Sequence, residues 1–375
     1  MSPSGAPSSS WRSIQRPRAA NRRLLAAPKL YLFLTVRQAP RRYSVLVLKP
    51  DTRTRDRASR PTQSGKDSML LECHSSKALP HVNGDGAAAS TQRGEYSLAT
   101  GASAVRRLRI LHNIYAPFGR TILLKAGLRP GMKVADFGCG VGLVSRMLAE
   151  IVGPAGRVVG IDASVEQVVQ AANLCRETGL DNTAFVAADA TNTDLPRESF
   201  DLVYCRYLLL HLPDPAACLR EMRSVLKPGG VIVVEDGDLA TATSLPPTAL
   251  DAFADLFTRL GPTRGVDYSV ASRLHQMVKA AGFPNPKMRI HQPAIAEGEN
   301  RLLLKWSVEE AGSAFVSAGL ITPEQLKRTL TAMQAATDDP EVVVLMPRLS
   351  AVWARKPAST EAVPPQDLKD DAGLA

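Results

Sequence analysis

The chain has 375 residues, which suits one large or two modest domains, and a formal net charge of +10. Residues 1–50 contain ten Lys or Arg residues and no acidic residue, so this segment alone accounts for the positive excess. Of the 46 basic and 36 acidic residues in the whole chain, 36 of each therefore remain for residues 51–375. The net charge does not support a nucleic-acid groove in this neutral body, and we expect no nucleic-acid partner.

The first 92 residues differ in kind from the rest of the chain. They are rich in Ser, Pro and Arg, and they show no alternation of strands and helices. This composition is typical of a mitochondrial or plastid transit peptide, of a disordered extension, or of an upstream stretch from an over-long gene start. We expect residues 1–92 to be disordered and the protein to be cytoplasmic, or mitochondrial if the segment is a transit peptide.

The domain boundaries follow from similar shifts in composition. Residues 93–356 are predicted to form the folded domain, and residues 357–375 a disordered tail, because that end is rich in Pro, Ala and Asp. The apolar stretch Leu24–Val36 is interrupted by Pro and Lys and is far shorter than the ~20 residues of a membrane helix. We therefore expect no membrane span.

The segment Val134–Gly142 reads V-A-D-F-G-C-G-V-G and is the most informative part of the chain. An apolar run leads into three alternate glycines, and Leu143–Ile151 then has apolar residues at helical spacing. Glycine allows positive φ and leaves bare backbone against a ligand. Asp162 closes the next apolar run, Val158–Ile161, where a carboxylate can accept both hydroxyls of a ribose. The pattern predicts a nucleoside-cofactor site.

The glycine spacing argues against two common nucleotide sites. A phosphate-binding P-loop has Gly-Lys-Ser/Thr after its glycines, whereas this loop continues Gly142–Val144. A dinucleotide loop has G-x-G-x-x-G, whereas Gly138, Gly140 and Gly142 give G-x-G-x-G. Asp136 would repel a pyrophosphate but suits a ligand that carries an ammonium and a sulfonium.

These residues resemble motif I, D/E-x-G-x-G-x-G, of class I S-adenosylmethionine-dependent methyltransferases. Three further segments resemble later motifs of that family in order, within about residues 100–290: Phe185–Ala190, Phe200–Cys205 and Leu226–Glu235 with its L-K-P-G-G turn. The set of motifs is similar to that of the small-molecule branch of the family, which includes ubiquinone and menaquinone C-methyltransferase-like and "type 11" proteins. The resemblance implies S-adenosyl-L-methionine as cofactor and a contact between Asp189 and the adenine amino group.

The implied fold is α/β, a Rossmann-like doubly wound seven-stranded sheet with helices on both faces. The residue pattern supports it independently, because short apolar runs alternate with helices that have their own start signals. Ser164 with Gln167 forms a capping-box pair, and Asp214 followed by Pro215 reads as a helix start. Ligands of such sheets bind at the carboxyl ends of the strands.

Beyond the fifth strand we predict a sixth strand at Lys287–His291 and a last strand near Val342–Trp353. The family usually joins these strands by a short hairpin, whereas here a helical insertion of about residues 300–338 intervenes. One helix is predicted at Arg301–Ala318, and a second begins at Thr322. We expect the insertion to cover the acceptor pocket; the alternative is a dimerisation surface.

Ten residues are predicted to bind the cofactor: Asp136, Gly138, Cys139, Gly140, Gly142, Asp162, Ala163, Asp189, Ala190 and Cys205. Instead of binding the cofactor, or in addition to it, Asp136 is a candidate to hold the loop by accepting hydrogen bonds from backbone amides. His211, which follows the fourth strand, is the candidate catalytic base, with helix capping or packing as the alternative. Glu235, Asp236 and Asp238 are candidates for the acceptor pocket, and Arg206 for an acceptor carboxylate or a surface ion pair.

The segment Val105–Gly127 resembles the part of these enzymes that folds over the cofactor as a lid. We expect Tyr115 within it to pack in the core, because its neighbours have helical spacing. The five cysteines include no C-x-x-C pair and no His at ligand spacing, so we predict no metal site.

The leading hypothesis is transfer of a methyl group from S-adenosylmethionine to a small organic acceptor, with O-, N- and C-methylation all open. A nicotinamide-dependent reductase on a similar fold is one alternative. A non-catalytic cofactor-binding assembly factor is another. The sequence assigns no oligomeric state.

Overall fold

The computed structural model describes residues 33–36, 43–46 and 102–358 of the chain. Strands β1 (Phe33–Val36) and β2 (Tyr43–Leu46) pair antiparallel within the N-terminal segment. The disorder predicted for the rest of residues 1–92, and for the tail beyond residue 358, lies outside the described residues.

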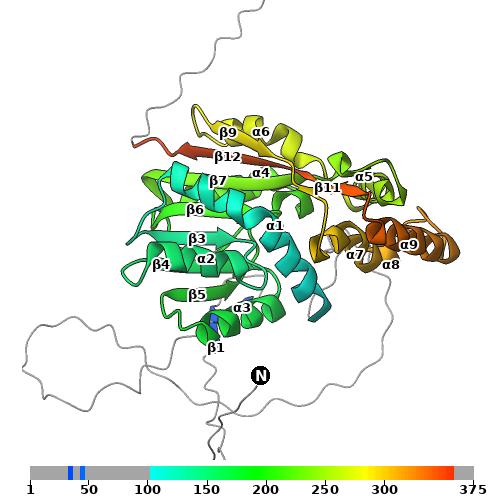
Figure 1. Cartoon of the computed structure of the whole chain (residues 1–375). Coiled ribbons are helices and arrows are strands. Elements are labelled where there is room, and N and C mark those ends of the chain that lie inside the picture. The colour runs from blue at the N-terminus through cyan, green and yellow to red at the C-terminus, as the bar shows by residue number, and fades with distance from the viewer. Residues whose placement is uncertain (1–32, 37–42, 47–101, 359–375) are drawn as a thin grey trace, which may run out of the picture. The chain divides into compact units, whose positions relative to one another are not determined.

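A seven-stranded sheet forms the centre of the fold, in the order β5-β4-β3-β6-β7-β12-β9 (Figure 1). The first five strands in this order are parallel to one another, and β12 is antiparallel to both β7 and β9. The predicted doubly wound sheet is confirmed. The strands are β3 (Lys133–Phe137), β4 (Arg157–Asp162), β5 (Thr183–Ala187), β6 (Phe200–Arg206), β7 (Leu226–Asp238), β9 (Lys287–His291) and β12 (Arg348–Arg355).

Helices cover both faces of this sheet because its central strands are apolar on both sides. One face carries α1 (Ala102–Ala126), α2 (Leu143–Val152) and α3 (Val165–Glu177). The other carries α4 (Pro215–Val225) and α6 (Leu274–Ala280). The predicted helix starts are confirmed: Ser164 accepts a hydrogen bond from the Gln167 amide at 3.3 Å, and Asp214 from the Ala217 amide at 2.9 Å.

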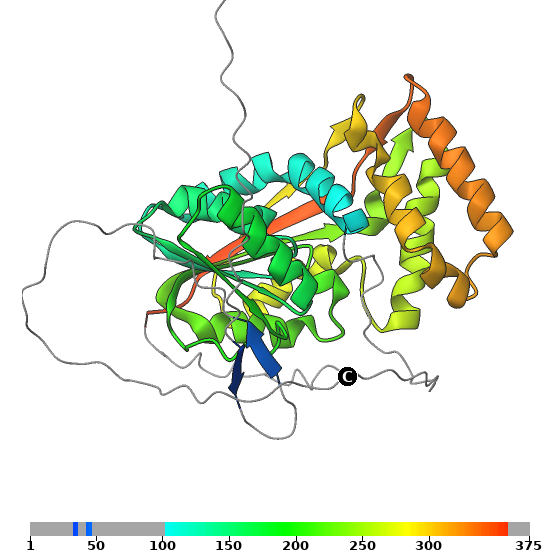
Figure 2. The same ribbon diagram turned by 90° about the horizontal axis from the view of Figure 1, so that it is seen from below.

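A second group of elements gathers beyond one end of the sheet (Figures 1 and 2). It combines a three-stranded sheet in the order β10-β11-β8 with four helices. The strands are β8 (Thr243–Leu245), β10 (Ala294–Ile295) and β11 (Val343–Leu345), and the helices are α5 (Ala252–Arg264), α7 (Leu303–Glu310), α8 (Gly312–Ser317) and α9 (Pro323–Asp338).

Two sequence predictions in this region were wrong. The last strand is two strands, because β11 pairs with β8 and β10 whereas β12, after Pro347, pairs with β7 and β9. The single helix predicted at Arg301–Ala318 is split at Ala311 into α7 and α8. A Cβ atom on Gly312 would lie 2.7 Å from Leu326 Cδ2, so glycine at the break allows α9 to pack closely.

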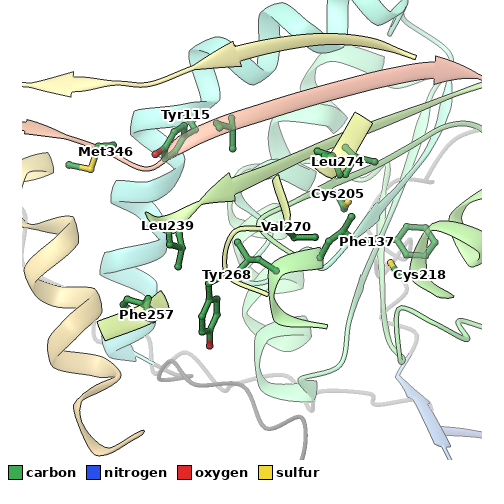
Figure 3. Close-up of a cluster of buried hydrophobic side chains, with 14 of the residues drawn as sticks. Tyr115, Phe137, Cys205, Cys218, Leu239, Phe257, Tyr268, Val270, Leu274 and Met346 are labelled. Atoms are coloured by element: carbon green, nitrogen blue, oxygen red, sulfur yellow. The ribbon is translucent and has the colours of Figure 1, made fainter. Parts of the chain in front are cut away.

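The largest core cluster joins the α4 and α6 face of the sheet to the second group of helices. Figure 3 shows this cluster from Phe137 and Cys205 of the sheet and Cys218 of α4 to Leu239 and Phe257. Tyr115 is fully buried, and its hydroxyl donates to the Pro347 carbonyl at 2.7 Å. Its predicted packing role is confirmed.

We predict that Gly142→Ala is more costly than Gly179→Ala, although both glycines have positive φ, at 82° and 73°. The αL conformation alone costs alanine about 1–2 kcal/mol. A Cβ atom on Gly142 would also lie 2.7 Å from Ala171 Cβ, whereas one on Gly179 meets nothing within 4 Å. Overpacking should add about 1–3 kcal/mol at Gly142. Urea unfolding of both variants measures the difference, and equal losses would show that close approach to α3 is unimportant.

Candidate functional site

The carboxyl ends of β3, β4 and β6 open into a cavity of about 780 Å³. One wall consists of the glycine loop after β3 and the residues that follow β4, β5 and β6. The far wall comes from α5 and α7, and residues of α1 complete the lining. Position and composition are those expected for a ligand site in a parallel sheet, where polar groups converge beside apolar side chains.

The glycine loop presents bare backbone to this cavity. Gly138 and Gly140 line it with φ of 68° and 53°, a conformation that side chains rarely adopt. A Cβ atom on Gly138 would lie 2.9 Å from Leu208 Cδ1, and one on Gly140 would lie 3.0 Å from Gln167 Oε1. Side chains at these positions would therefore strain the backbone and crowd the cavity wall.

Asp162 holds this loop in place from the end of β4. Its Oδ2 accepts a hydrogen bond from the Gly140 amide and its Oδ1 one from the Ser164 amide, both at 2.9 Å. Burial raises the pKa of Asp162, and these two amides oppose the rise. Each carboxylate oxygen can accept a further hydrogen bond, so the side chain can hold the loop and bind two hydroxyl groups at once.

Asp189 lies further along the same wall, after β5. Its Oδ1 accepts hydrogen bonds from the Thr191 amide at 2.8 Å and from the Thr191 hydroxyl at 2.7 Å. Its Oδ2 accepts none from the described residues, so it can receive a ligand donor. Ala163 and Ala190 line the cavity nearby.

Seven of the ten predicted cofactor residues thus line one cavity, whereas Asp136, Gly142 and Cys205 do not. Asp136 is 2% exposed and accepts a hydrogen bond from Ser145 Oγ at 2.5 Å, so it lies behind the loop. Gly142 packs against Ala171. Cys205 is fully buried in the same core cluster as Cys218, on the face of the sheet opposite to that of Arg206.

The three acids predicted for the acceptor pocket are not among its lining residues either. Glu235, Asp236 and Asp238 lie within β7, which is longer than expected because β12 pairs with it as far as Asp238. Asp236 accepts hydrogen bonds from the amides of Leu209 at 2.7 Å and Gly237 at 2.9 Å. Asp236 therefore shapes the turn after β6 rather than the cavity surface.

His211 does line the cavity, and its ring meets the Tyr268 ring edge-on at 5.9 Å. Burial, together with the charge of Arg107, lowers the pKa of His211 to about 3. The imidazole is therefore neutral near pH 7. It can accept a proton or a hydrogen bond, but so low a pKa makes it a weak base.

Individual side chains of α5 and α7 in the cavity wall could not be predicted from the sequence. The far wall includes Phe253, Phe257, Leu303, Leu304 and Ser307. Their helical spacing is also that of ordinary core residues, so spacing alone could not identify them. The expectation that the insertion covers the pocket agrees with the position of α7.

Two ion pairs connect α1 to this far wall. Arg107, only 4% exposed, pairs with Glu310 of α7 at 2.7 Å. Arg106 pairs with Glu299, and its guanidinium lies 4.3 Å from the centre of the Trp306 ring. Leu108, Leu111 and His112 of α1 line the cavity between these contacts and the sheet. Helix α1 therefore occupies the position expected of a lid.

The described residues offer neither a metal cluster nor a membrane helix. No group of three or more His, Cys, Asp or Glu side chains there could hold a metal ion. None of the helices in that part of the chain is long and apolar enough to cross a membrane.

Residues 128–280 match the model of a family described as "Methyltransferase domain". Over these residues the chain is similar to methyltransferase domains. The resemblance to class I S-adenosylmethionine-dependent methyltransferases, inferred from the motifs, is thereby confirmed.

Curated proteins similar to the methyltransferase domain act on different compounds. Phosphoethanolamine N-methyltransferase 1 of Arabidopsis thaliana is 36% identical over 160 residues, 42% of this chain and 30% of that protein. Cycloartenol-C-24-methyltransferase of the same plant is 38% identical over 109 residues, 29% of this chain and 32% of that protein. Demethylmenaquinone methyltransferase of Staphylococcus aureus is 29% identical over 167 residues, 44% of this chain and 67% of that protein. The chain spans about 30% of the length of the phosphoethanolamine enzymes it matches.

Among solved structures, phosphoethanolamine N-methyltransferase 2 of Haemonchus contortus, in complex with S-adenosyl-L-methionine, has 18% sequence identity and a TM-score of 0.42. The similarity covers 68% of this chain and 52% of that chain.

We predict that the free energy of unfolding decreases from pH 5 to pH 8, and that ionisation of Asp136 causes part of this decrease. Burial raises the pKa of Asp136 from 3.8 to about 7. Because the folded state holds the proton of Asp136 more tightly than the unfolded chain does, this carboxyl stabilises the folded state fully below pH 4. That stabilisation is lost as the pH rises through 7. Asp136→Asn should abolish about 2–3 kcal/mol of this decline, measured by urea unfolding at both pH values. An identical decline in the variant would contradict the assignment.

Proposed function

We propose that this chain transfers a methyl group from S-adenosylmethionine to a small organic acceptor. The observation that carries the proposal is the glycine loop tied to Asp162 at the edge of the cavity, where bare backbone and a half-buried carboxylate face the same space. The methyltransferase domain match supports it.

The residues present fit the methyl donor. Asp162 has acceptor capacity for two ribose hydroxyls, and Asp189 keeps a carboxylate oxygen for an amino group. A ligand can approach the backbone at Gly138 and Gly140 closely, because glycine has no Cβ atom in the way. A dinucleotide would place its pyrophosphate against this acidic wall, which disfavours the reductase alternative.

Bound in this wall, S-adenosylmethionine supplies a methyl group on a positively charged sulfur. The chain itself then contributes mainly proximity and orientation, as in other in-line displacements. The far wall from α5 and α7 excludes water, because Phe257, Leu303 and Leu304 are nearly or fully buried while lining the cavity. The neutral His211 imidazole can accept a hydrogen bond from an acceptor hydroxyl or amine.

We predict that wild-type protein binds S-adenosylhomocysteine and that Asp162→Ala weakens this binding by about ten- to hundredfold, because hydrogen bonds to a carboxylate are lost. Isothermal titration measures both affinities. Asp181→Ala, an exposed acid before β5, is the matched control and should bind like wild type. Absence of binding by wild type, or undiminished binding by Asp162→Ala, would refute the donor site.

We also predict that Leu304→Phe separates acceptor binding from donor binding. The larger side chain should fill part of the far wall and reduce methyl transfer at least about tenfold, while the affinity for S-adenosylhomocysteine stays within about threefold. Transfer is measured with isotopically labelled methyl donor on a metabolite extract, read by mass spectrometry. Leu124→Phe makes the same exchange at an exposed position of α1 outside the cavity and is the control.

Equal transfer by Leu304→Phe and wild type would contradict the assignment of this wall to the acceptor. Donor binding by wild type without transfer to any compound of the extract would instead favour the non-catalytic alternative.

A further inference from the structure

Arg206 ends β6 and lies in the cavity wall beside the glycine loop. In the parallel pairing of β3 with β6, Cys205 lies opposite Phe137. Gly138 directly follows Phe137, and both Gly138 and Arg206 line the cavity. Leu108 and His112 of α1 line the same part of the cavity.

The guanidinium of Arg206 lacks an anionic partner among the described residues, although it is half-buried. Its Nη2 hydrogen-bonds His112 Nδ1 at 3.1 Å, and its buried Nη1 has no hydrogen-bond partner there. Burial, followed by the charge of Arg206, lowers the pKa of His112 to about 4, so this imidazole is neutral near pH 7. It accepts a hydrogen bond but does not neutralise the charge.

Two buried carboxylates on the same face of the sheet do not fill this role. Asp136 accepts from Ser145 Oγ, and Glu235 accepts from the Tyr204 hydroxyl at 2.5 Å. Neither forms an ion pair with Arg206, although its charge opposes the rise that burial causes in the pKa of each. Burying a guanidinium without a paired anion costs free energy, because the charge loses contact with water. Charge-assisted hydrogen bonds to a bound carboxylate would offset that cost.

We propose that Arg206 binds the carboxylate of the amino-acid part of S-adenosylmethionine. This assignment rests on the proposed function and identifies which residue recognises that end of the donor. The donor is the favoured source of the carboxylate because Arg206 lies beside Gly138 on the glycine-loop wall. The far wall is apolar, and Arg107, which also lines the cavity, already pairs with Glu310.

The test compares S-adenosylmethionine with decarboxylated S-adenosylmethionine, which keeps the ammonium and the sulfonium and lacks only the carboxylate. Isothermal titration of wild type and Arg206→Met gives four affinities. We expect the variant to lose about ten- to hundredfold in affinity for S-adenosylmethionine and less than about threefold for the decarboxylated compound. Arg206→Lys should lose less than Arg206→Met, because it keeps the charge but not the two-nitrogen fork.

Equal losses for the two compounds would overturn the assignment, because they would show that Arg206 only supports the fold around Asp136 and Glu235. Unchanged affinity for both would also overturn it, as expected if the guanidinium instead meets a carboxylate of the acceptor. Failure of wild type to bind either compound would refute the proposed function itself. Arg176→Met, which removes an exposed guanidinium on α3, is the matched control and should bind both compounds like wild type.

Discussion

The carboxylate of Asp162 is the interaction on which the site depends. Hydrogen bonds from the Gly140 and Ser164 amides join the glycine loop after β3 to the start of α3 through one side chain. The bridge restrains Gly140, one of three alternate glycines with positive φ in this loop. Glycine loses more conformational freedom on folding than any other residue, so this restraint matters. The bridge also leaves the loop backbone facing the cavity.

The electrostatics behind this wall are unusual for a buried region. Burial raises the pKa of Asp136 and of Asp236 to about 7, and both carboxyls have hydrogen-bond donors beside them. Arg206 is a half-buried cation that lines the cavity together with the loop, and it hydrogen-bonds a neutral imidazole. A donor that carries both a carboxylate and positive groups matches this distribution better than a pyrophosphate would. Fold and charge thus favour the same ligand.

Much of this arrangement could be predicted from the sequence, because glycine spacing and strand-end acids are local signals. The sheet, the positions of Gly138, Asp162 and Asp189, and the helix starts at Ser164 and Asp214 all followed from them. Cys205 was misplaced because strand side chains alternate between faces, and it is the next residue, Arg206, that reaches the cavity. The length of β7 and the break at Ala311 depend on contacts with β12 and α9, which no local pattern encodes.

The central claim is that the cavity wall formed by the glycine loop and Asp162 binds the methyl donor. A crystal structure of the chain with S-adenosylhomocysteine tests it most directly. The account predicts ribose hydroxyls within hydrogen-bond distance of the Asp162 carboxylate and the thioether chain along Gly138 and Gly140. Density for the ligand at another surface, or a ribose held without Asp162, would contradict the account.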